Sequence, residues 1–550
     1  MHSPFAGVTP RLRVHRVPRR TPAARAAVPN AFRATLASAG STTYAVELAP
    51  TAARLERLYR FAEQARGAGV TLFLTDGAGG HDAPSPDATA ADLARLMNRQ
   101  PVVTVACKHA TRQALLTRLG GLEERGLENA LIVTGDFPRA PDARQRGPFP
   151  LDSVSLLLAA TRGAAGPAVR AWLGATVNPF RYAEAEVWGQ RIKAWKKWRA
   201  GAAYLVAQIG YDVLKLQELR LWLARDGMAE VPALASVHVL HRRTVGLLRG
   251  GRLPGVYLPP DLEEGAARLD LAAAHRRAAL LADVAVRGLG YRGVLFGGVE
   301  RYEHLAAILA IKDELAARDW RESYEEYRHA PPADPSAADP GTAAPISFAP
   351  PGAYYLFPAG SDALLAAASE LAGDRPPVHA PRALRWVHDA FFSRGAPGAA
   401  LAAHAACAAL SLGLAPAVAR VERAIKGPLL GCRLCGDCRI PAFGYRCPVD
   451  GCPKGLLNGP CAGARADGSC EVDPARECFW RPVVGMALAA QQLEPLYLAQ
   501  PPRQPALQGT SSWINHFAGL TAPAAALGAI PVGTPVGTPP PPQPDPRRTA

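Results

Sequence analysis

The chain has 550 residues, of which 49% are hydrophobic and 20% charged, so it is long enough for two or three domains that each bury a core. No run of eighteen or more uninterrupted apolar residues occurs, and this predicts that no helix crosses a membrane. The net charge of +15 would suit nucleic acid, but residues 1–40 alone hold seven arginines and no acidic residue. This segment alone therefore supplies about half of the excess positive charge, and we expect no nucleic-acid partner.

The first 30 residues predict a basic, disordered tail. An arginine-rich, acid-free start also fits an organelle transit peptide, and this alternative stays open. The apolar segment of a secretory signal is missing, which predicts a cytoplasmic protein. Thiols stay reduced in the cytoplasm, so clustered cysteines there indicate metal binding rather than disulfides.

Residues 31–327 alternate short apolar runs with stretches of helical periodicity such as AARLERLYRFAEQARG. Eight strands, each followed by a helix, predict a (β/α)₈ TIM barrel. A doubly wound sheet is the competing fold, but no GxGxxG follows the first run. The eight predicted strands are 44–48, 71–75, 102–107, 130–135, 172–177, 204–208, 233–240 and 293–298.

Polar side chains follow several of these strands at the end where the chemistry of such barrels gathers. Asp76 and Asn178 could equally cap the next helix or shape a turn. A carboxylate at Glu47 is costly inside a barrel unless it is used or is paired, for example with Lys197 or Arg199. The predicted site comprises Glu47, Asp76, Asp136, Asn178 and Gln208.

A proline- and alanine-rich linker is expected at 328–352, a cysteine-rich domain at 353–520 and a proline-rich disordered tail at 521–550. The metal-binding core of that domain is expected at 431–478. It contains Cys432, Cys435, Cys438, Cys447, Cys452, Cys461, Cys470 and Cys478.

Eight thiolates can satisfy two four-coordinate metal sites. A C-x2-C-x2-C run with a distant Cys-Pro favours two [4Fe-4S] clusters, because three closely spaced thiolates can hold one face of a cluster. Structural zinc stays open as the alternative. Cys107 and Cys407 lie outside the block and are expected at buried apolar positions.

Two sets of motifs resemble known families. The order VELAP, TVACKHATRQAL, GLENALIVTGDFPRA, GATVNPF and KKWRAGAAYLVAQIGYD is similar to methylenetetrahydrofolate reductase over most of residues 31–298. The block CRLCGDC…CPVDGCPKGLLNGPCAG…CEVDPAREC resembles the cysteine-rich methylenetetrahydrofolate reductase C-terminal domain. Ala462 stands where that family usually has glycine, and this matters only if the backbone there needs a positive φ.

The resemblance implies a flavin-dependent oxidoreductase of one-carbon metabolism, active in tetrahydrofolate interconversion and methionine biosynthesis. It would reduce 5,10-methylenetetrahydrofolate to 5-methyltetrahydrofolate, with FAD or alternatively FMN, and with NAD(P)H or a ferredoxin-type protein as donor. Glu47 would be the general acid, Asp136 would stabilise the 5-iminium cation beside the flavin, and Gln208 would bind the pterin. The remaining flavin contacts implied are Thr75, Asp152, Ser153, Asn178 and Lys197. A homo-oligomer is left open.

The sequence departs from the family at Leu48-Ala49, at Thr134 and near Thr104 and Val105, all around the expected flavin. The identity of the flavin and its direct reduction by NAD(P)H therefore stay open. Two other functions also stay open. One is a non-catalytic barrel scaffold with an iron-sulfur electron-transfer domain. The other is a zinc-thiolate methyltransferase, which would need cysteines at the strand ends, where only Cys107 lies.

Overall fold

The computed structural model describes residues 28–76, 85–108, 110–137, 149–163, 168–250, 253–268, 270–329, 345–357, 382–393 and 395–531. Most of the predicted basic tail, much of the predicted linker and the end of the proline-rich tail lie outside these residues.

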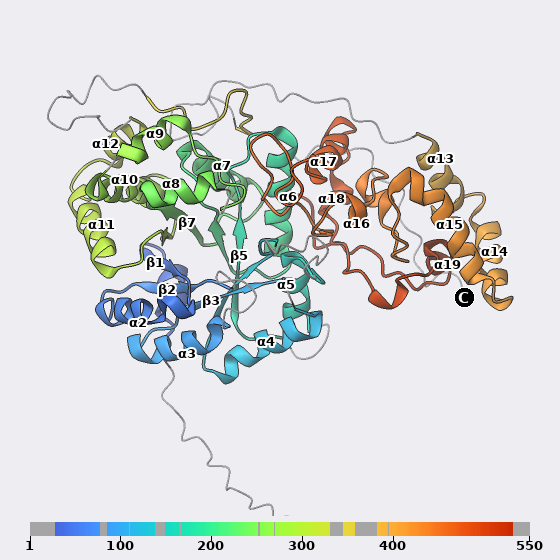
Figure 1. The fold of residues 1–550 in the computed structure, drawn as a ribbon, viewed down its shortest axis with the longest axis horizontal. Helices are drawn as coiled ribbons and strands as arrows, with labels where there is room; N and C mark the ends of the chain where they lie inside the picture. The colour runs from blue at the N-terminus through green and yellow to red at the C-terminus, as the bar shows by residue number, and fades with distance from the viewer. Residues whose placement is uncertain are drawn as a thin grey trace, which may run out of the picture.

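Eight parallel strands form a closed barrel in chain order, with the first strand paired to the eighth. This confirms the predicted (β/α)₈ fold and all eight predicted strands (Figure 1). Four strands are buried along their whole length and the other four at most of their positions, as expected for a parallel sheet that is filled inside and covered by helices outside. The strands are β1 Thr43–Leu48, β2 Thr71–Leu74, β3 Val102–Ala106, β4 Asn129–Val133, β5 Trp172–Val177, β6 Tyr204–Ala207, β7 Ala233–His238 and β8 Gly293–Gly297.

The helices that follow the strands form the outer layer. Several begin at a side chain that accepts a backbone N–H, such as Asp212 before α7 and Asp270 before α10. Within the described ranges, no helix is both long and apolar enough to cross a membrane. The helices of the barrel are α2 Leu55–Gln64, α3 Pro86–Met97, α4 Arg112–Glu124, α5 Ser153–Thr161, α6 Glu184–Arg199, α7 Val213–Arg225, α8 Arg242–Arg249, α9 Pro260–Arg268, α10 Leu271–Asp283, α11 Tyr302–Leu315 and α12 Trp320–Arg328.

A short helix before the barrel, α1 (Ala31–Ala37), closes the end of the barrel opposite the predicted site. Phe32 is fully buried and contacts the rings of Phe73, Trp172 and Tyr204, with centroids 5.3–5.5 Å apart. Side chains therefore fill this end, and the barrel is open only at the carboxyl ends of its strands.

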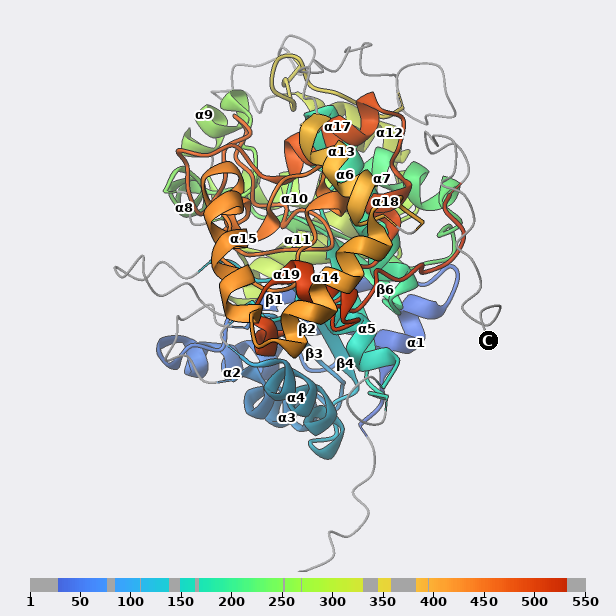
Figure 2. The ribbon, with the colours of Figure 1, turned by 90° about the vertical axis from the view of Figure 1, so that its right-hand side faces the viewer.

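The C-terminal region lies against one side of the barrel, and its helices α13, α14, α15 and α19 are farthest from it (Figures 1 and 2). Helix α17 packs on α6, where Val484 lies beside Gly189. Trp480 and Val483 share one continuous apolar core with the barrel. The helices of this region are α13 Arg382–Phe391, α14 Ala399–Ser411, α15 Ala415–Leu430, α16 Pro448–Gly451, α17 Trp480–Ala489, α18 Glu494–Tyr497 and α19 Ser512–Phe517.

Two stretches expected to be structureless are partly packed. In the predicted linker, Ile346 is buried and Phe348 stacks on Tyr327 with centroids 5.3 Å apart. In the predicted tail, Leu527 is buried and Ala525 bridges to Ala499. Isolated apolar residues within proline-rich sequence account for both differences, because each one packs into an apolar cluster of the folded protein.

Candidate active site

A cavity of about 2170 Å³ opens at the carboxyl ends of the strands. The barrel forms most of its wall, and the segment between Asp450 and Arg476 of the cysteine-rich region completes it. All five polar residues predicted at the strand ends line this cavity, as do Thr75 and Lys197. The sequence therefore located the right end of the barrel, and a second domain forms part of the same cavity.

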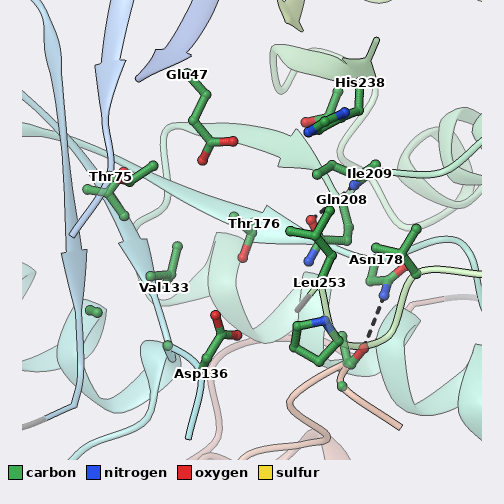
Figure 3. Close-up of a pocket in the computed structure, with 18 of the residues that line it drawn as sticks. Glu47, Thr75, Val133, Asp136, Thr176, Asn178, Gln208, Ile209, His238 and Leu253 are labelled. Atoms are coloured by element: carbon green, nitrogen blue, oxygen red, sulfur yellow. Dashed lines mark hydrogen bonds between the residues drawn. The ribbon is translucent and has the colours of Figure 1, made fainter. Parts of the chain in front are cut away.

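Glu47 lies near the end of β1 with its side chain in the cavity, on the side facing Asp136 (Figure 3). Burial, and then the carboxylate of Asp136, raises the pKa of Glu47 above its ordinary value. The expected structural partners are engaged elsewhere: Lys197 Nζ donates to the Thr176 carbonyl, and Arg199 Nε donates to the Leu527 carbonyl at 2.7 Å. Among the described residues nothing pairs with the Glu47 carboxyl group, which can therefore hold a proton and give it to a bound molecule.

Asp136 is exposed to the cavity and follows Gly135, which has a φ of +89°. This positive φ turns the chain at the end of β4 and directs the carboxylate inward (Figure 3). Lys454, from the cysteine-rich region, donates from Nζ to the Gly135 carbonyl at 2.9 Å and forms an ion pair with Glu471. A buried lysine of the second domain thus holds the backbone that carries Asp136.

The side-chain amides of Gln208 and Asn178 also line the cavity. Gln208 Oε1 accepts the N–H of Ile209 at 3.0 Å, which leaves its NH₂ group available to the cavity. Asn178 is engaged on both sides, because Oδ1 accepts the Phe180 N–H at 2.9 Å and Nδ2 donates to the Ala462 carbonyl at 3.3 Å. Gln208 can therefore bind a ligand directly, whereas Asn178 mainly joins the barrel to the second domain.

Thr75 lies one residue beyond β2. Its Oγ1 is buried and has no hydrogen-bond partner among the described residues. Thr75 itself lines the cavity, and a buried hydroxyl without a partner is unusual unless a ligand or water satisfies it.

The lysines of α6 do not form an ordinary basic surface. Lys193, Lys196 and Lys197 are all buried, and Lys193 Nζ donates to the Pro460 carbonyl at 2.8 Å. Burial lowers the pKa of Lys196 to about 7, and burial together with the charge of Lys193 lowers the pKa of Lys197 well below its ordinary value. An anion in the cavity would stabilise the charged form of Lys197, which lines it.

Three carboxylate or hydroxyl residues of the predicted set are occupied by the protein itself. Asp152 and Ser153 are buried and do not line the cavity. Asp152 caps α5 and accepts the backbone N–H of Asn458 at 3.0 Å, and Ser153 accepts from Thr134 at 3.3 Å. Asp76 accepts from Arg118 at 2.7 Å, so it is an ion-pair partner as well as a lining residue.

The eight cysteines of the block divide into two sets of four. Cys432, Cys435, Cys438 and Cys447 line one small cavity. Besides burial, the pKa of Cys447 is raised by Cys438 and Cys432, and the pKa of Cys435, raised to about 11, by Cys438 and Cys447.

The second set contains Cys452, Cys461, Cys470 and Cys478. Burial, and secondarily the thiolate of Cys470, raises the pKa of Cys452. The pKa of Cys478 is also raised, first by burial and then by Cys461 and Cys452. Cys461 also lines the large cavity. All ten cysteines are free thiols, and within the described residues no three His, Cys, Asp or Glu side chains are close enough together to hold a metal ion.

Cys107 is buried, as expected, but Cys407 is exposed, so the prediction of a buried position for it was wrong. It lies on α14, where alanine-rich sequence resembles a buried helix but one face remains uncovered.

Ala462 adopts a φ of +70°. The alanine that stands where the family usually has glycine therefore occupies a position that needs a positive φ. Its carbonyl accepts hydrogen bonds from Asn178 and Arg181, and it approaches Gly255 so closely that a Cβ there would lie 2.1 Å from the carbonyl oxygen. The alanine is therefore held in a strained conformation by contacts with the barrel.

Lys454 and Glu471 are site residues that the sequence did not reveal, as is His238 at the end of β7. Burial lowers the pKa of His238 to about 4, so the ring is neutral near pH 7. The available signals were a lysine in CPKGLLNGPC and a histidine that ends an apolar strand. Neither indicates by itself which residues meet across two domains.

The sequence model described as methylenetetrahydrofolate reductase matches residues 31–280, and the one described as methylene-tetrahydrofolate reductase C terminal matches residues 413–505. The chain is a methylenetetrahydrofolate reductase family barrel fused to that family's C-terminal domain. Membership of this family supports a folate-related enzyme and, in general terms, flavin binding.

Several solved structures resemble about half of the chain. An uncharacterized protein from Clostridium thermocellum that binds two copies of 5-methyl-5,6,7,8-tetrahydrofolic acid is 12% identical, with a TM-score of 0.39 over 52% of this chain and 99% of that one. Tryptophan synthase from M. tuberculosis is 14% identical, with a TM-score of 0.30 over 52% of this chain and 94% of that one. No curated protein matches the chain.

Proposed function

We propose that the protein reduces 5,10-methylenetetrahydrofolate to 5-methyltetrahydrofolate. The observation that carries this proposal is Glu47, a carboxyl group without a partner among the described residues and with a raised pKa, in a cavity of a methylenetetrahydrofolate reductase family barrel. A barrel kept only as a scaffold would gain nothing from an unpaired carboxyl group at this depth.

Opening the five-membered ring of the substrate requires a proton on one nitrogen and leaves a 5-iminium cation. Glu47 supplies that proton, since its raised pKa keeps it protonated closer to neutral pH than an ordinary glutamate. Asp136 opposes the positive charge that develops as the ring opens. The free NH₂ group of Gln208 donates to an acceptor of the pterin and fixes its orientation.

FAD, or alternatively FMN, supplies the hydride when bound. The residues present fit such a group: the Thr75 hydroxyl lacks a hydrogen-bond partner among the described residues, and a phosphate would stabilise the charged form of Lys197, whose pKa burial lowers. Asn178 would contact it at the cavity wall. Asp152 and Ser153 would act from behind this wall, through the start of α5.

Each set of four cysteines would ligate one metal ion or cluster once its thiolates are drawn together, because within the described residues no three of them are yet that close. As [4Fe-4S] clusters they would carry electrons from a ferredoxin-type donor, and as zinc sites they would brace the fold while NAD(P)H reduces the flavin. The position of Cys461 at the large cavity favours the redox alternative.

The deciding experiment separates the two half-reactions in the purified protein by stopped-flow absorbance. In Glu47→Gln, reduction of the flavin by its donor should continue, while oxidation of the reduced flavin by 5,10-methylenetetrahydrofolate should fall by a factor of about 100 or more. Glu186→Gln is the matched control, because burial also raises the pKa of Glu186 but this residue lies outside the cavity lining. If Glu47→Gln retains both half-reactions, another group is the acid.

A further inference from the structure

Three arginines from distant parts of the chain meet at one edge of the cavity. Arg54 and Arg57 follow β1, Arg243 lies in the first turn of α8 after β7, and all three reach Glu300, between β8 and α11. Nitrogen-to-oxygen distances are 3.4 Å for Arg54, 2.5 Å for Arg57 and 3.4 Å for Arg243. Among the described residues, Glu300 is the only carboxylate in ion-pair contact with any of them.

One carboxylate cannot neutralise three guanidinium groups, so this arginine cluster (Arg54, Arg57 and Arg243) carries excess positive charge. The arginine side chains are 40%, 50% and 60% exposed, whereas Glu300 is 28% exposed. All four residues line the cavity that contains Glu47. The cluster is thus open to a ligand that already occupies the cavity.

Position in the fold supports a binding role. Barrels of this kind commonly bind anionic groups after the seventh and eighth strands, and Arg243 lies in the first turn of α8, after β7, while Glu300 lies in the loop after β8. Guanidinium groups bind carboxylates and phosphates through paired N–H groups. A structural role alone would need only one arginine to neutralise Glu300.

We propose that the arginine cluster binds a flexible chain carrying several negative charges, which extends from a ligand whose reacting ring lies near Glu47. This rests on the proposed function, under which the charges are either linked carboxylates on the folate substrate or phosphates on a nicotinamide donor. Both sources share the same chemistry, an extended polyanion at the mouth of the cavity.

The first experiment measures binding of inorganic tripolyphosphate to the full chain by calorimetry, so it does not depend on folate. Arg57→Gln/Arg243→Gln should weaken binding roughly fivefold to tenfold, an effect that shrinks as salt is raised. Glu300→Gln should tighten binding, because it removes the carboxylate that competes for the three arginines. Arg60→Gln is the matched control: Arg60 lies on the same helix α2, pairs with Glu56 and does not line the cavity.

Equal tripolyphosphate affinity in the wild type and the double variant would overturn the proposal, as would no binding to the wild type. The second experiment measures, for the wild type and the double variant, the affinity for 5-methyltetrahydrofolate with one or with three γ-linked glutamates and the affinity for NADPH. Loss of the triglutamate advantage in the double variant assigns the cluster to the substrate, and a selective loss of NADPH affinity assigns it to the donor; either supports the proposal. If the wild type binds no folate, the proposed function fails, while the tripolyphosphate result still decides the anion site.

Discussion

Replacing Lys454 by methionine would test whether the C-terminal domain is part of the active site. Lys454 is 3% exposed and its partner Glu471 is 7% exposed, and the lysine also holds the Gly135 carbonyl at 2.9 Å. The variant leaves a carboxylate buried without its cation and a carbonyl without its donor. Removing one partner of a buried ion pair typically costs about 3–5 kcal/mol, so we expect a loss of stability of that order.

The double variant Lys454→Met/Glu471→Gln should recover most of this loss, since replacing both charges removes the unpaired carboxylate. Differential scanning calorimetry measures the midpoints of thermal unfolding, and the hydrogen-exchange rate of the Asp136 amide measures local opening of this backbone. The rate of folate reduction should fall in both variants, because both release the backbone that carries Asp136.

Lys215→Met is the control, because Lys215 and Glu218 form a buried pair on α7 that does not line the cavity. This variant should lose stability but keep its rate of folate reduction once folded. The reasoning would be refuted if Lys454→Met melted at the wild-type temperature, or if the double variant recovered the rate as well as the stability.

Four further changes have defined outcomes. The rate of folate reduction should fall as pH rises through the raised pKa of Glu47, and in Asp136→Asn this fall should begin at lower pH, measured by single-turnover kinetics, because the neighbouring carboxylate no longer raises that pKa. At a pH above the raised pKa of Glu47, Glu47→Gln should unfold at a higher denaturant concentration than the wild type. The difference in the free energy of unfolding should be absent in acid and should grow by about 1.4 kcal/mol per pH unit between the ordinary and the raised pKa. Ala462→Gly should raise the free energy of unfolding by roughly 0.5 kcal/mol and the thermal midpoint slightly, because relief of the positive φ exceeds the entropy cost of glycine. Cys435→Ala and Cys470→Ala should each remove about half of the bound iron or zinc in elemental analysis, and loss of all metal from either variant would contradict two separate sites.

The sequence predicted the barrel well because each strand is a short apolar run and its polar residues follow at the end. This pattern located Glu47, Asp136 and Gln208 in one cavity before any contact was known. Of the local roles predicted for Asp76 and Asn178, Asn178 shapes a turn by accepting the Phe180 N–H, whereas Asp76 pairs with Arg118, which lies 42 positions away.

The contacts between the domains could not be predicted in the same way. KAWKKWR has the composition of a solvated helix face, yet its lysines are buried because α17 and the Pro460 segment cover α6. The pairing of Asp152 with Asn458 joins residues 306 positions apart, and no periodicity records such a distance. The number of cysteines predicted two sites of four, while which set faces the cavity depends on how the domains pack.

The shared core changes how the cysteine-rich domain should be regarded. Its residues Trp480 and Val484 belong to the same apolar cluster as the barrel, and Lys454 and Cys461 line the cavity that contains Glu47. A domain that served only as a tethered electron carrier would need a surface contact and a linker. Here the removal of residues 382–531 would expose the buried lysines of α6 and open one wall of the cavity, so we infer that the barrel and the C-terminal domain form one catalytic unit.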